Sequence, residues 1–162
     1  MPDTTPTSDT ALLFQFFNEV GIINQLATAM FQARLPPGFL VSQFAVLNHL
    51  IRVGDGRTPL DLARAFQVPK TTMTHTLAVL ERHALVRMAP NPKDGRSKCV
   101  WITDAGRTFR TDAIAALGPD IAGLAAAFPV DRIAAILPTL SALRSLLDAQ
   151  RDGPSTAPTP PA

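Results

Sequence analysis

Short hydrogen-bonding side chains recur between Thr71 and Arg82 at the spacing of one helix face. At 3.6 residues per turn, the residues that share this face are Thr71, Thr74, His75, Ala78 and Arg82. Apolar residues occupy the opposite face, namely Met73, Leu77, Leu80 and Ala84. The polar face contains no acid. An exposed helix face of this kind suits hydrogen bonding to base edges in a DNA major groove.

A shorter helix is predicted immediately before this one. Thr58 can cap its N-terminus, Pro59 suits the first helical position, and Asp61 completes the spacing of a capping box. Its apolar face is expected to consist of Leu60, Ala63 and Phe66. The sequence Val68-Pro69-Lys70 ends the pattern, and the second helix is expected to begin near Lys70–Thr72. Two short helices joined this tightly predict a helix-turn-helix.

Two short apolar segments follow, Leu85–Met88 and Lys98–Ile102, on either side of a turn-rich stretch. They predict a β-hairpin whose turn contains Asp94-Gly95. Arg96 at the tip can enter a narrow minor groove, where the negative potential is concentrated. Asp94 is expected to hold the guanidinium by a charge-assisted bond.

Lysines of the hairpin are expected to contact phosphates, which adds affinity without sequence information. The complete set of predicted DNA contacts comprises Lys70, Thr71, Thr72, Thr74, His75, Arg82, Lys93, Asp94, Arg96 and Lys98.

This segment resembles the multiple-antibiotic-resistance regulator (MarR) family of winged helix-turn-helix transcription factors. The resemblance is carried by the helix Met73–Glu81, by Leu85-Val86, by the wing Asp94-Gly95-Arg96, and by Ile102–Gly106. It extends over roughly residues 11–151. Two positions depart from the family: His75 stands where Arg is frequent, and Ala84 replaces a common Gly at the helix end. The first departure concerns base preference and the second concerns the turn.

The charge distribution supports the same interpretation without reference to a family. Residues 57–110 contain ten Lys or Arg and four acids, a net charge of +6. The rest of the chain contains five Lys or Arg and nine acids, a net charge of −4, in agreement with the total of +2. A basic middle segment between acidic ends predicts a polyanionic partner for the middle segment.

Composition narrows the function classes. A chain of 162 residues with 46% hydrophobic residues fits one mainly helical domain. The single cysteine, Cys99, excludes an internal disulfide and favours a cytoplasmic location. The start, Met1-Pro2-Asp3, predicts no signal peptide, and the apolar stretch 113–130 is interrupted by Pro119, Asp120 and Pro129, so it predicts packed helix and not a membrane span.

No catalytic motif or phosphate-binding loop is present, and the three histidines lack the spacing of metal ligands. We therefore expect neither an enzyme nor a metal site nor a cofactor.

The expected fold is mainly α with a small β-wing. Residues 1–8 and 152–162 are Pro-rich and expected to be disordered. Residues 9–151 form the MarR-like domain, with the winged helix-turn-helix at about 42–106 and dimerisation helices at about 9–33 and 104–151. Ser42 and Thr103 are expected to cap helices, Gly118-Pro119 should kink or restart the helix after the wing, and Pro138 should kink the last helix.

The first helix is expected to expose a wide apolar stripe, for which pairing with a second copy is the simplest solution. The stripe comprises Leu13, Phe17, Val20, Ile23, Leu26 and Met30, widened by further phenylalanines. The sequence and the resemblance thus predict a homodimeric regulator, a repressor, that binds a pseudo-palindromic operator. A small apolar or aromatic effector bound between the dimer helices and the DNA-binding parts would release the DNA. The alternatives are a redox-sensing regulator that uses Cys99, and a winged-helix protein-interaction module that does not bind DNA.

Overall fold

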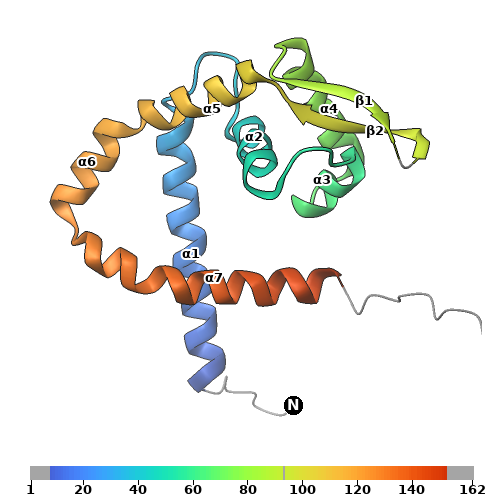
Figure 1. Cartoon of the computed structure of the whole chain (residues 1–162). Helices are drawn as coiled ribbons and strands as arrows, with labels where there is room; N and C mark the ends of the chain where they lie inside the picture. Colours follow the sequence, from blue (N-terminus) through green and yellow to red (C-terminus); the bar gives the residue numbers. More distant parts are fainter. Residues whose placement is uncertain (1–7, 93, 153–162) are drawn as a thin grey trace, which may run out of the picture. The chain divides into compact units, whose positions relative to one another are not determined.

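The computed structural model describes residues 8–92 and 94–152. Within these residues it contains, in chain order, α1 (Ser8–Gln32), α2 (Val41–Val53), α3 (Pro59–Ala65), α4 (Lys70–Arg82), β1 (Val86–Asn91), β2 (Asp94–Ile102), α5 (Asp104–Ala116), α6 (Gly118–Ala127) and α7 (Val130–Asp152) (Figure 1). Contacts divide the chain into two compact units, residues 1–118 and 119–162. The mainly helical fold with a two-stranded antiparallel wing is therefore the predicted one. The expectations for residues 1–7 and 153–162 lie outside the described residues; Ser8 and Asp152 are both helical.

Local capping explains where most helices of the first unit begin. The Thr58 hydroxyl accepts a hydrogen bond from the Asp61 backbone N–H, and the Asp61 carboxylate accepts one from the Thr58 N–H, both at 3.1 Å. Thr103 caps α5 in the same way by accepting from the Gly106 N–H at 3.0 Å. Both predicted caps are confirmed, since each satisfies an N–H that the helix itself leaves free.

The prediction for α2 was wrong in its cap. The helix begins one residue before Ser42, and the buried side chain of Gln43 accepts the Leu40 N–H at 3.0 Å. A second glutamine fixes the same entry, because Gln32 donates to the Phe39 carbonyl and accepts from the Val41 N–H. Side chains from α1 and from within α2 therefore replace the expected hydroxyl.

The core of the first unit lies between α2, α3, α4 and the two strands. Its buried residues are Val46, Leu47, Leu50, Leu62, Ala63, Met73, Leu77, Leu80, Leu85, Val86, Val100 and Ile102. The predicted inner face of α4 is confirmed except at Ala84, which lies beyond the helix end, exposed, at φ 56°. On α3 the inward leucine is Leu62, and Leu60 is exposed, so that part of the prediction was wrong. We call residues 41–102, which surround this core, the winged lobe.

The hairpin pairs Val86 with Ile102 and continues in regular register to Pro90 and Lys98, after which Asn91 pairs with Asp94. Asp94 and Gly95 therefore belong to β2, and the expected Asp-Gly turn was misplaced. Arg57 forms an isolated bridge with Val100 on the other side of β2. The chain between α2 and α3 thus supports the wing.

None of the residues of helix α1 is buried, and nine of its large apolar side chains are exposed to solvent. Its contact with the rest of its unit lies near its C-terminal end, where the Phe31 ring packs on Phe44 with centroids 4.3 Å apart.

The second unit also exposes apolar side chains along α6 and α7, and α7 continues as one helix across Pro138. As predicted, the chain restarts at Gly118 after α5 has ended. In the described residues no single helix is long and apolar enough to cross a membrane.

Candidate nucleic-acid interface

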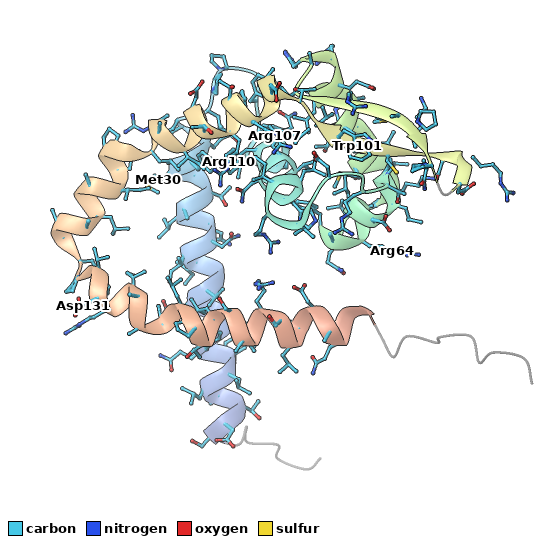
Figure 2. All side chains as sticks on the ribbon, in the orientation of Figure 1. Met30, Arg64, Trp101, Arg107, Arg110 and Asp131 are labelled. Atoms are coloured by element: carbon cyan, nitrogen blue, oxygen red, sulfur yellow. The ribbon has the colours of Figure 1, made fainter. Side chains whose placement is uncertain are left out.

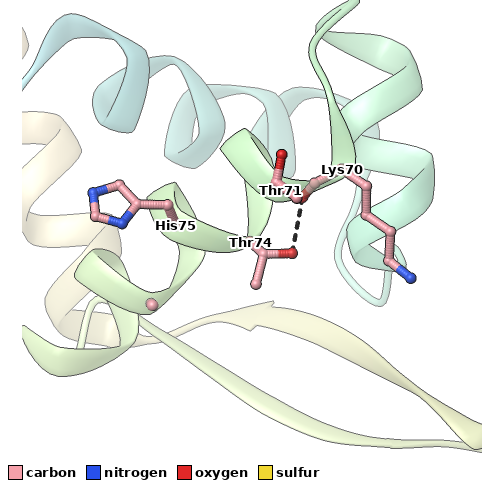
Figure 3. A pocket seen from close by; sticks show the side chains of 5 residues that line it. Lys70, Thr71, Thr74 and His75 are labelled. Atoms are coloured by element: carbon pink, nitrogen blue, oxygen red, sulfur yellow. Dashed lines mark hydrogen bonds between the residues drawn. The ribbon is translucent and has the colours of Figure 1, made fainter.

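The outer face of α4 presents an open hollow of about 530 Å³ lined by Lys70, Thr71, Thr74, His75 and Ala78 (Figure 3). All five residues are exposed. Four of them are predicted DNA contacts, which the helix brings together because they stand one or two turns apart on one face. Arg82 lies one turn beyond Ala78 on the same face and is also exposed. The lining of the hollow supplies one cation, Lys70, and hydrogen-bonding groups but no carboxylate.

The threonines of α4 differ in what they can offer. The Thr74 hydroxyl donates to the Lys70 carbonyl at 2.8 Å, so its oxygen remains to accept a bond, as from a base amino group (Figure 3). Thr71 lies in the hollow one turn earlier. Thr72 is exposed but does not line the hollow, because its place in the helix differs from that of Thr71 and Thr74 by about a third of a turn or more. It is therefore separated from the other predicted contacts.

The wing tip exposes Arg96, whose side chain is 98% accessible to solvent. The Asp94 carboxylate lies 3.7 Å from the guanidinium, too far for a hydrogen bond, and instead accepts the Arg96 backbone N–H at 3.1 Å. The expected pairing of Asp94 with the guanidinium is thus present as a loose ion pair without a hydrogen bond, and the same carboxylate also holds the Arg96 backbone. Lys98 is exposed on β2, and the prediction for Lys93 lies outside the described residues.

One aspartate of the α2–α3 connection joins the wing to α5. The Asp55 carboxylate accepts the Ile102 backbone N–H at 3.1 Å with one oxygen and pairs with Arg107 at 3.1 Å with the other. Arg110 adds two hydrogen bonds to the Asn48 side chain on α2, and both arginines are labelled on α5 in Figure 2. These contacts connect the base of the wing to the α2–α3 connection and α5, and connect α5 to α2.

The start of α5 is packed so closely that it requires glycine at position 106. A Cβ there would overlap the Leu85 carbonyl oxygen and lie 2.8 Å from the Ile102 side chain. The Thr103 N–H donates to the same Leu85 carbonyl at 3.1 Å, and its hydroxyl donates to the Ala84 carbonyl at 2.7 Å. Thr103 and Gly106 thus join the residues that follow α4 to the end of β2.

Sequence reasoning gave no role to Arg87, whose guanidinium lies over the Trp101 ring at 5.5 Å from its centroid. The two residues are paired across the hairpin. The alternation of side chains along the two strands could therefore have predicted this contact. Trp101, labelled in Figure 2, also packs on Gly56 and is half-buried, in agreement with a packing role. Asp55 was missed as well, because both its partners lie about 50 residues away in sequence.

Cys99 is buried on β2. Within residues 8–92 and 94–152, no three His, Cys, Asp or Glu side chains are grouped in a way that could hold a metal ion.

Comparison with known proteins adds a family to this geometry. Residues 38–97 match the sequence model of the MarR family. The transcriptional activatory protein BadR of Rhodopseudomonas palustris is 31% identical over 98 residues, which represent 59% of this chain and 54% of BadR. The chain thus spans about half the length of this curated relative.

Solved structures share the fold. The transcriptional regulator BldR of Sulfolobus solfataricus superposes with a TM-score of 0.68 at 23% identity, covering 88% of this chain and 99% of BldR. A mutant MarR of E. coli in complex with operator DNA superposes with a TM-score of 0.65 at 22% identity, covering 81% of this chain and 94% of that one.

Proposed function

We propose that the chain is a transcription regulator of the MarR family, whose sequence model residues 38–97 match, and that it binds double-stranded operator DNA as a homodimer. The family and fold are those of non-enzymatic regulators, which agrees with the expectation from sequence. DNA as the partner also implies a cytoplasmic location.

The observation that carries the proposal is the acid-free hollow on α4. Its lining supplies a cation, two hydroxyls and an imidazole on one exposed helix face. A major groove admits an α-helix, and its base edges offer acceptors, amino donors and the thymine methyl group. We assign the reading of bases to Thr71, Thr74 and His75, and phosphate contacts to Lys70 and Arg82.

The wing extends this surface to the minor groove. Arg96 is fully available to a ligand, and a narrow minor groove attracts arginine through its concentrated negative potential. Lys98 is exposed on the same strand and suits a phosphate contact. We assign specificity for the flanks of the operator to Arg96.

Dimerisation is supported by the apolar surface of α1, where large side chains from Leu12 to Met30 are exposed. Contiguous exposed apolar surface of this extent marks an interaction site in proteins. A two-fold dimer would place its two recognition helices about one DNA turn apart, roughly 34–36 Å, and would require a pseudo-palindromic operator.

The remaining parts of the proposal concern regulation. We propose a small apolar or aromatic effector that binds between the dimer helices and the winged lobes and favours a spacing of the recognition helices unsuited to DNA. Repression is our expectation from sequence, while the relative BadR is a transcriptional activatory protein. The position of the operator relative to the promoter would distinguish repression from activation.

The burial of Cys99 disfavours the redox alternative, since reactive cysteines are accessible thiolates. The basic hollow disfavours the protein-interaction alternative. For Cys99→Ala we expect operator release by peroxide to be the same as in the parent; release confined to the parent would establish the redox reading.

The proposed function is tested by sequencing the fragments that the purified protein retains from genomic DNA. We expect an enriched pseudo-palindrome with half-site centres about 10–10.5 base pairs apart. Retention without any enriched sequence, while the protein remains folded and dimeric, would contradict the proposal.

A further inference from the structure

Side-chain hydrogen bonds stabilise the wing tip, where the regular backbone pairing of the two strands is interrupted. Regular pairing of β1 with β2 ends at Pro90, which has no N–H to donate. Beyond it the register shifts, so that Asn91 pairs with Asp94, and residues 95–97 form an excursion on the β2 side. This excursion contains Arg96.

Among the described residues of the wing, the following hydrogen bonds close the excursion. The Asn91 amide donates to the Ser97 hydroxyl at 2.9 Å, and that hydroxyl donates to the Asp94 carbonyl at 3.1 Å. The Asp94 carboxylate accepts the Arg96 N–H at 3.1 Å. The serine hydroxyl accepts and donates at once, so the bonds on either side of it strengthen each other, and Asp94 accepts the last of them as well as the Arg96 N–H.

These hydrogen bonds fix the backbone of Arg96 and leave its side chain free. Asn91 and Ser97 are half-buried, whereas the side chains of Asp94 and Arg96 are 52% and 98% exposed. The guanidinium itself has only the 3.7 Å contact with Asp94, a weak exposed pair. The internal hydrogen bonds of the wing tip therefore fix the direction in which the Arg96 side chain leaves the backbone.

We propose that Asn91 and Ser97 are positioning residues that orient Arg96 toward the minor groove before DNA arrives. A backbone already fixed in the bound geometry loses less conformational entropy on binding, so the arginine contact contributes more to affinity. The inference rests on the proposed function, because it takes the minor groove as the ligand of Arg96.

The test is a double-mutant cycle between Ser97 and Arg96, measured by fluorescence anisotropy on two operator duplexes that differ only in A·T-rich or G·C-rich flanks. The variants of the full chain are Ser97→Ala, Arg96→Ala and the double variant. Ser97→Thr is the matched control, because it keeps a hydroxyl. Asn91→Ala is an independent second variant, since it removes the amide that donates to Ser97 and keeps the serine hydroxyl.

We expect Ser97→Ala and Asn91→Ala to weaken binding to the A·T-flanked duplex about fivefold, as for the loss of one hydrogen bond, and to change binding to the G·C-flanked duplex less than about twofold. Ser97→Thr should behave as the parent. In the Arg96→Ala background, Ser97→Ala should have no further effect, because the residue acts only through the arginine.

Losses that add in the double variant, or equal losses on both duplexes, would overturn the positioning role. Loss of flank discrimination in Arg96→Ala but not in Ser97→Ala or Asn91→Ala would overturn this inference alone. No effect of Arg96→Ala on either duplex would instead overturn the proposed wing contact and the inference with it.

Discussion

The winged lobe and helix α1 use apolar residues in opposite ways. The lobe gathers twelve buried residues into one core, eleven from three helices and two strands and one, Leu85, from just before β1, while the outer face of α4 is polar and free of acids. In α1 none of the 25 residues is buried, and side chains as large as Phe14 and Leu26 face outward. The lobe thus buries most of its apolar residues within one chain, whereas the apolar side chains of α1 stay exposed. Under the proposed function, the lobe binds DNA and α1 contributes to the dimer.

The largest effect is expected from charge on α1. The double substitution Leu13→Glu and Phe17→Glu places two carboxylates on adjacent turns where the side chains are 55% and 45% exposed. Each change should weaken self-association by about 2–4 kcal/mol, because buried interface anchors lose that much on truncation. Sedimentation velocity should therefore show a monomer, or unfolding, at micromolar concentration.

The matched control for α1 is Leu60→Glu on α3, a leucine of the winged lobe that is 43% exposed. Its dimer should persist, since the lobe buries its core without a partner. A Leu13→Glu, Phe17→Glu variant that remains as dimeric as the control would break the contrast between the two regions.

The next effect concerns the packed junction at the base of the wing. Gly106→Ala introduces a methyl group against the Leu85 carbonyl oxygen, and backbone atoms have to move. We expect the free energy of unfolding to fall by about 3 kcal/mol. Gly118→Ala has open space at its Cβ and should leave thermal unfolding nearly unchanged; equal melting temperatures for the two variants would contradict this packing.

A smaller effect is expected at Asp55. Asp55→Ala removes the acceptor of the Ile102 N–H and the partner of Arg107, and should cost about 1–3 kcal/mol. Asp55→Asn keeps an acceptor for the Ile102 N–H and loses only the half-exposed ion pair, so its cost should be below about 1 kcal/mol. Urea unfolding of both variants measures the difference, and a larger loss for Asp55→Asn would show that the charge dominates.

The smallest effect is a gain. Ala84 occupies the left-handed region at φ 56°, where glycine is free of the steric cost that alanine carries. Ala84→Gly should stabilise the winged lobe by about 1 kcal/mol, and thermal unfolding should register the rise. A lower melting temperature would mean that the entropy of the unfolded glycine chain outweighs the relief.

The sequence predicted the features that depend on neighbouring residues. Thr58 with Asp61, and Thr103 with Gly106, could be recognised as caps because each pair lies three positions apart. The inner face of α4 could be read from its period. The prediction of Ser42 as a cap was wrong because the side chains of Gln43 and Gln32 accept the backbone N–H groups of Leu40 and Val41 at the start of α2. Gln32 belongs to another helix, so a local pattern does not show it.

The parts of the site that could not be predicted depend on long-range contacts or on register. Asp55 meets residues 47 and 52 positions away, which no local pattern encodes. The Asp-Gly turn was misplaced because Pro90 ends the regular ladder and the side chains of Asn91 and Ser97 stabilise a shifted pairing. The direction of the Arg96 side chain follows from that shifted pairing. The sequence therefore predicted an arginine at the wing tip, but it did not predict the hydrogen bonds of Asn91 and Ser97 that hold its backbone.

The most direct test of DNA as the partner compares Thr74→Ala, His75→Ala and Arg96→Ala with the parent on operator and scrambled duplexes across a salt series. The two α4 variants should lose preference within the half-site by about 1–3 kcal/mol for each base contact, and Arg96→Ala should lose preference at the flanks. Lys98→Ala, as the phosphate control, should weaken binding to both duplexes and make its salt dependence shallower by about one charge. Unchanged binding of all three variants to both duplexes would contradict the account, since neither the α4 hollow nor the wing would then contact DNA.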